Sequence, residues 1–145
     1  MKSFHAYQNE FFDLYLAGKI AEALNLVDEI KIACPDMAYR TKFWEACLHS
    51  IRNEKALAIK ALEELKDMGY WLSPKILEHD RDLENIKEEP EFVEILGVFK
   101  QRQDKALKLS ASSKLEFLPS GSLQSKLPLI ITLHWRLGNA EEFSN

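Results

Sequence analysis

The feature that most constrains this chain is an apolar pattern that recurs after about 35 residues in its first half. Shifting the sequence by that period places Gly18 on Asn53 and Ala23 on Ala58. Glycine and asparagine are the residues that most readily take the left-handed backbone conformation of a tight turn. Periods of this length are typical of arrays of stacked helical hairpins. The pattern therefore predicts a mainly α-helical domain built from repeated hairpins.

Four stretches carry apolar residues at steps of three and four, which is the spacing of a helix with one buried face. We expect these helices within residues 4–15, 20–30, 39–48 and 57–65. The small side chain of alanine at positions 23 and 58 would let the two helices of each hairpin approach closely. Phe11 and Phe43 are expected in the core.

The stretch AGKIAEALNLVDEIKIACPD resembles the second half of a tetratricopeptide repeat, because Gly18, Ala23 and Pro35 stand at the spacing of that family. Residues 53–70 repeat it more loosely. The resemblance covers roughly residues 3–70. It implies a non-catalytic protein-interaction module whose concave groove binds a protein or peptide segment. Tyr7, Tyr39 and Trp44 are the candidate partner-binding residues.

A further helical segment follows the two hairpins. Ser73 is a suitable N-cap, with Pro74 just inside the helix, and Pro90 opens another helix. The second helix has an apolar face, for which we expect Phe92, Val93, Leu96 and Phe99. This segment resembles the one that often closes tetratricopeptide arrays, matching it at Asp80, Leu83, Pro90, Phe92 and Leu96. A terminal helix of this kind covers the apolar face that a stack of hairpins leaves exposed.

The pattern changes after the helical region, which we assign to residues 3–107. Residues 108–128 are rich in serine and read as a linker with one short strand near residues 115–118. Residues 129–133 (LIITL) have the composition of a strand buried on both faces. Two strands are marginal alone. To be stable, the two strands would have to pack against further strands, against the helices, or against a second copy of the chain. In the last case the protein would be a homo-oligomer that pairs through residues 129–133.

The last stretch, PLIITLHWRLGNAEEF, resembles the strand-to-loop start of α/β-hydrolase esterases related to phospholipases and carboxylesterases. That family follows a buried strand with a loop of the type His-Gly-x-Gly-Gly-Asn, and His134, Gly138 and Asn139 match it. Trp135 and Leu137 stand where the family has glycine. The resemblance implies that the backbone N–H of Arg136 would be half of an oxyanion hole. Residues 129–145 are thus interpreted as the strand-loop-helix start of such a hydrolase domain, with an ordinary buried strand and turn as the other interpretation. Within this stretch a vestigial oxyanion loop would comprise His134, Trp135, Arg136, Gly138 and Asn139.

The catalytic parts of such an enzyme are missing from these residues. The family needs a G-x-S-x-G elbow for its nucleophile, followed by an acid and a histidine, and no such elbow occurs. We therefore assign no catalytic residue. The alternative to an interaction module is the amino-terminal fragment of a serine esterase, inactive without its catalytic part.

The composition argues against some classes of partner and indicates where in the cell the protein is located. The net charge of −4 and the lack of a basic stretch argue against nucleic acid, and no apolar run reaches the length of a membrane span. Cys34 and Cys47 do not make a disulfide framework, and the first residues lack the apolar core of a signal peptide, so we expect a cytoplasmic protein. No cofactor is expected. A metal is not expected either, because the cluster of His79, Asp80, Asp82 and Glu84 contains only one histidine.

Overall fold

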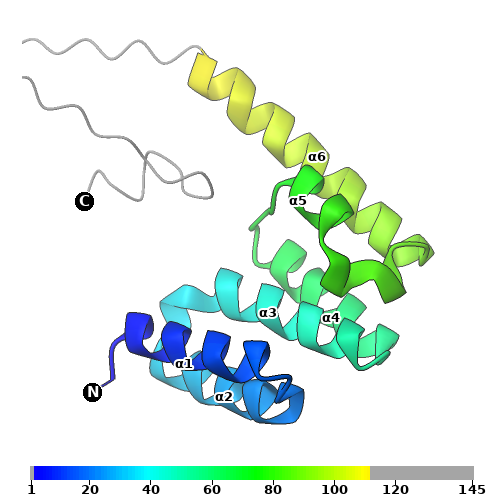
Figure 1. Cartoon of the computed structure of the whole chain (residues 1–145). Coiled ribbons are helices and arrows are strands. Elements are labelled where there is room, and N and C mark those ends of the chain that lie inside the picture. Colours follow the sequence, from blue (N-terminus) through cyan, green and yellow to red (C-terminus); the bar gives the residue numbers. More distant parts are fainter. Residues whose placement is uncertain (1, 112–145) are drawn as a thin grey trace, which may run out of the picture. The chain divides into compact units, whose positions relative to one another are not determined.

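The computed structural model describes residues 2–111, with side chains as far as Leu109. Their elements follow one another along the chain in Figure 1 as α1 (Phe4–Leu16), α2 (Ile20–Ala33), the 3₁₀ helix η1 (Pro35–Met37), α3 (Ala38–Ile51), α4 (Lys55–Asp67), α5 (Pro74–His79), the 3₁₀ helix η2 (Arg81–Ile86) and α6 (Pro90–Ala111). This part of the chain contains no strand, and the predicted mainly helical class is confirmed for it. The strands expected at residues 115–118 and 129–133 lie outside the described residues. The predicted linker begins at residue 108, where α6 still continues.

The chain divides into two compact units, Met1–Asp104 and Lys105–Asn145. Only the end of α6 is described in the second unit. The fold given below is that of the first unit.

The two predicted turns have the same backbone geometry. Gly18 and Asn53 both take the left-handed conformation, with φ of 71° and 60°. In each turn this residue donates its N–H to the carbonyl three residues back, at 3.0 and 2.9 Å, and the next N–H reaches the carbonyl five residues back, at 2.9 Å. Such paired bonds satisfy carbonyl groups that the end of a helix leaves open. The same turn thus closes α1 and α3, and the prediction made for Gly18 and Asn53 is confirmed.

Helix α3 is the centre of the first unit, because it contributes to two apolar clusters. Trp44 and Leu48 belong to the cluster formed with α1 and α2. Ala46 and Cys47 belong to the cluster formed with α4, η2 and α6. Phe43 is half-buried and packs against both clusters, so its core position is only partly as predicted. Phe11 is 3% exposed and confirms its predicted place in the core.

Helix α6 closes the second cluster with a face slightly different from the predicted one. Phe92, Ile95 and Phe99 are almost fully buried in it. Val93, which we expected on this face, is 59% exposed. The prediction was wrong at this position because the buried stripe follows residues 92, 95 and 99, and Val93 lies to one side of it. The guanidinium of Arg102 donates to the carbonyl oxygens of Lys66 and Tyr70, at 2.8 and 2.6 Å, and so caps the end of α4.

The helix starts follow the sequence signals with one difference. Pro74 and Pro90 open α5 and α6 as predicted. Ser73 is the N-cap residue of α5, but its side chain makes no capping hydrogen bond. At the start of α1 the Oγ of Ser3 does accept from the N–H of Ala6, at 3.3 Å. Among the described residues, no helix combines the length and apolar character needed to cross a bilayer.

A matched pair of glycine substitutions tests the left-handed turn. Gly18→Ala should destabilise the domain by about 1 kcal/mol, because a Cβ meets nothing within 4 Å and the only cost is the positive φ. Gly97→Ala should stabilise it by about 0.5–1 kcal/mol, because Gly97 is inside α6 and also has open space around it. Urea unfolding of both variants measures the two changes. Equal effects at the two positions would contradict the assigned role of Gly18.

Candidate functional site

A groove between α1, α3 and the start of η2 is the strongest candidate site in the described part of the chain. Its cavity has a volume of about 200 Å³. Helix α1 provides Phe11, Phe12 and Tyr15, and α3 provides Phe43, Trp44, Cys47 and Leu48. Asp80 and Asp82 complete the lining at the segment after α5. The groove is therefore mainly aromatic, with two carboxylates at one end.

The aromatic side chains form a connected set centred on Trp44. The ring of Phe11 stacks on Trp44 with centroids 4.2 Å apart and an interplanar angle of 12°. Phe12 meets the same indole edge to face at 5.9 Å, and Tyr15 stacks on Phe11 at 6.3 Å. Phe11 and Trp44 are buried, whereas Phe12 is 40% exposed. The more exposed rings, Phe12 and the half-buried Tyr15 and Phe43, can meet a ligand.

The polar end of the groove is held by hydrogen bonds. The hydroxyl of Tyr15 donates to Oδ2 of Asp82 at 2.8 Å, and the N–H of Asp82 donates to Oδ1 of Asp80 at 3.0 Å. The bond to Asp82, assisted by burial and by the negative charge of Asp82, raises the pKa of Tyr15 to about 12. Tyr15 therefore stays neutral at physiological pH and remains a donor that fixes Asp82.

Cys47 lies beside the two carboxylates. Its Sγ and one oxygen each of Asp80 and Asp82 all lie within 4.8 Å of one another. Burial raises the pKa of the Cys47 thiol well above its ordinary value, and the charges of Asp80 and Asp82 raise it further. Burial likewise raises the pKa of Asp80. Because the thiolate is the reactive form, Cys47 is a poor nucleophile, and no histidine lines this groove to act as its base.

The structure divides the acidic and histidine cluster that the sequence analysis considered for a metal. Asp80 and Asp82 face the groove, whereas Nδ1 of His79 bonds to the carbonyl of Lys75 at 2.8 Å and Glu84 pairs with Lys87. Cys47 is the third member of the group that contains Asp80 and Asp82. The sequence analysis missed Cys47 because it lies on a different helix. The three side chains offer one ligand atom each, one fewer than a closed tetrahedral zinc site has.

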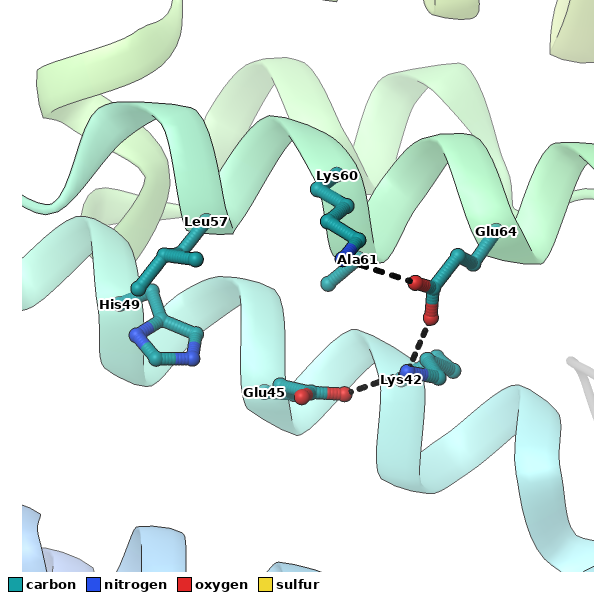
Figure 2. Close-up of a pocket in the computed structure, with 7 residues that line it drawn as sticks. All are labelled: Lys42, Glu45, His49, Leu57, Lys60, Ala61 and Glu64. Carbon is teal, nitrogen blue, oxygen red and sulfur yellow. Dashed lines mark hydrogen bonds and ion pairs between the residues drawn. The ribbon is translucent and has the colours of Figure 1, made fainter.

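A second, smaller cavity lies between α3 and α4 and has a volume of about 90 Å³. Figure 2 shows its charged side chains turned toward one another: Lys42 bonds to both Glu45 and Glu64. Burial alone would lower the pKa of Lys42, but the hydrogen bonds to the two glutamates offset this and the pKa is raised. Glu45 also pairs with Lys31, at 2.9 Å. These charges neutralise one another, so we interpret this cavity as part of the packing between the helices.

The candidate partner-binding residues occupy different environments. Tyr7 is 6% exposed, and its hydroxyl donates to Glu29 at 2.8 Å. Tyr39 is half-buried and lies 5.7 Å from the ring of Tyr70. Trp44 is the one of the three that lines the groove, although it is 8% exposed. Their role toward a partner stays a prediction, and the burial of Tyr7 and Trp44 leaves little surface for it.

Phe12 and Tyr15 were not singled out as site residues from the sequence, and Asp80 and Asp82 were considered there only as possible metal ligands. Phe12, Tyr15, Asp80 and Asp82 come together only through the packing of η2 against the hairpins. The signal available in the sequence was the adjacent pair Phe11-Phe12, because neighbouring side chains leave a helix in different directions and, on α1, Phe11 is buried whereas Phe12 is exposed. The predicted oxyanion loop, His134, Trp135, Arg136, Gly138 and Asn139, lies outside the described residues.

Alkaline titration tests the bond between Tyr15 and Asp82. Tyrosinate absorbance should show one of the four tyrosines ionising near pH 12, and Tyr15→Phe should remove that phase. Since the unfolded chain ionises Tyr15 near pH 10, its contribution to the free energy of unfolding is present below pH 10 and is lost as the pH rises to about 12. Asp82→Asn should shift the Tyr15 phase toward pH 10. Loss of a phase near pH 10 in Tyr15→Phe would contradict the bond.

Comparison with known proteins identifies the helical region. The family model described as "A/B hydrolase-like, N-terminal domain" matches residues 3–107. No curated protein and no solved structure gives a significant match. The match falls on the helices rather than on residues 129–145, where the sequence resembles a hydrolase, and it supports the hydrolase part of that resemblance. The tetratricopeptide assignment has no such support and stays a prediction. With most of its length matched, the chain belongs to the family of A/B hydrolase-like N-terminal domains.

Proposed function

We propose that residues 3–107 are the non-catalytic amino-terminal domain of an α/β-hydrolase-like protein whose catalytic domain follows on the same polypeptide. The match of these residues to a family described as an N-terminal domain carries the proposal. It favours the hydrolase alternative over an interaction module that works alone.

The chemistry of the groove is consistent with a non-catalytic role. Acyl transfer needs a nucleophile, a base within hydrogen-bond reach and donors for the oxyanion. The groove offers a thiol whose pKa is raised and a tyrosine hydroxyl that is already bonded to Asp82. Nδ1 of His49, on the other side of α3 in the second cavity, bonds to Glu54 at 2.7 Å. No nucleophile and base are therefore paired in this groove.

The proposal also assigns a role to the carboxyl-terminal residues. Residues 129–133 would be the first buried strand of the catalytic domain, and the loop from His134 to Asn139 would approach its oxyanion site. Trp135 and Leu137 replace glycines there, so the N–H of Arg136 would be a poorly placed donor. A cytoplasmic location and pairing of two chains through residues 129–133 remain predictions beside this one.

The gene provides the first test. The reading frame after codon 145 should encode a G-x-S-x-G elbow, followed by an acidic residue and a histidine. A continuation that encodes an unrelated fold would contradict the proposal.

Esterase assays provide the second test. The purified 145-residue chain should not hydrolyse short-chain nitrophenyl esters above the buffer rate, whereas the protein extended through the elbow, the acid and the histidine should do so. Trp135→Gly and Leu137→Gly in the 145-residue chain should not create activity, because the missing nucleophile lies elsewhere. Turnover by the short chain that a serine-directed phosphonate abolishes, with a labelled serine found by mass spectrometry, would show the non-catalytic assignment to be wrong.

A further inference from the structure

We propose that the surface around Arg40 binds an acidic peptide segment through the carboxylate of a glutamate or aspartate side chain. This surface, the Arg40 surface, consists of Phe4, Tyr39, Arg40 and Tyr70. The proposal goes beyond the hydrolase-associated role and does not depend on it, since it concerns only contacts within the first unit. It rests on a cation without a counter-charge, on two hydrogen-bond donors without acceptors and on adjoining aromatic rings.

The guanidinium of Arg40 is held in place by neutral groups. Its Nε donates to the hydroxyl of Tyr39 at 2.9 Å, and its Nη1 donates to Oε1 of Gln8 at 3.3 Å. Its central carbon lies 5.5 Å from the ring centroid of Phe4 and 5.6 Å from that of Tyr39, so the cation contacts aromatic rings from both α1 and α3. These contacts orient the guanidinium in advance, which lowers the entropy cost of binding a ligand.

No carboxylate of the described residues pairs with this cation, although the net charge of the chain is −4. Arg40 is half-buried, and its two hydrogen-bond partners among residues 2–109 are both uncharged. Asp36, in η1, is exposed and forms no ion pair with it. The first turn of α3 contains no acidic residue, and its N-cap Met37 makes no side-chain capping bond. A half-buried cation near the positive end of a helix favours an anion supplied from outside.

Two donors of the Arg40 surface have no acceptor in the described region. Because the hydroxyl of Tyr39 accepts from Arg40, its own proton is available, and it donates to no group among residues 2–109. The Nη2 of Arg40 donates to no group there either. In the planar guanidinium one N–H of Nη2 is parallel to the N–H of Nε, so an oxygen bound to Nη2 would lie beside the oxygen of Tyr39. A carboxylate, which has two accepting oxygens and the opposite charge, matches both donors.

Aromatic rings continue the Arg40 surface toward the segment that follows α4. The rings of Tyr39 and Tyr70 lie 5.7 Å apart, and Tyr70 is 40% exposed. The carbonyl of Tyr70 accepts from Arg102, which fixes this segment against α6. Arginine and tyrosine are enriched where proteins bind one another, and they often contribute much of the binding energy. A peptide whose glutamate pairs with Arg40 can therefore place a neighbouring apolar side chain on Tyr70.

Two capped tetrapeptides test the charge requirement: acetyl-Gly-Glu-Phe-Gly-amide and the same peptide with glutamine in place of glutamate. We would titrate both into the 145-residue chain and follow the Nε–H of Arg40 and the rings of Tyr39 and Tyr70 by NMR. The glutamate peptide should give saturable shifts. The glutamine peptide should bind at least ten-fold more weakly, because it keeps the shape and loses the charge. Equal affinities, or no saturable shift with the glutamate peptide, would overturn the proposal.

Matched variants assign the effect to Arg40. Arg40→Gln should weaken binding of the glutamate peptide at least ten-fold, and Arg40→Lys should also weaken it, because lysine keeps the charge but not the parallel N–H groups. Arg81→Gln removes the same charge at an exposed position in η2 and should leave binding unchanged. Circular dichroism checks that each variant folds, and the two peptides decide on the unaltered chain if Arg40→Gln does not. An equal loss in Arg40→Gln and Arg81→Gln would contradict the assignment. Saturation by inorganic phosphate, with none by the glutamate peptide, would overturn it as well, because it would assign a phosphate site.

Discussion

The burial of α3 on two sides is the constraint on which the rest of the first unit depends. Trp44 and Leu48 hold the first hairpin, and Ala46 and Cys47 face the elements that follow. A helix that is apolar on two sides can be buried only between two layers, so both neighbours must be present for either cluster to be complete. The groove is a direct result, since its walls come from α3 and from elements on both sides of it.

Much of the helical order could be predicted from the sequence because its signals are local. The left-handed turns at Gly18 and Asn53 and the prolines that open α5 and α6 are local preferences of single residues. The exposed Val93 could not be predicted, because the face that α6 buries depends on where α6 meets α4 and η2. The groove was missed for the same reason. Cys47 and Asp82 become neighbours only when η2 packs on α3, and no spacing in the sequence records that contact.

The hydrolase resemblance and the family match fall on different parts of the chain. The resemblance rests on the strand and loop of residues 129–145, whereas the family model covers the helices of residues 3–107. Many families of helical proteins share the same apolar spacing. The hairpins by themselves therefore resemble tetratricopeptide repeats.

The hydrogen bond from Tyr15 to Asp82 joins residues 67 positions apart. The hairpins of α1 with α2 and of α3 with α4 need only neighbouring segments, and contacts of that range form quickly. The groove, by contrast, is complete only when η2 returns to α1. During synthesis on the ribosome the aromatic rings of α1 and α3 therefore emerge well before the carboxylates that close the groove. Burial of Phe11 and Trp44 needs only α1, α2 and α3, so the aromatic wall can form first and the carboxylate end of the groove is added last.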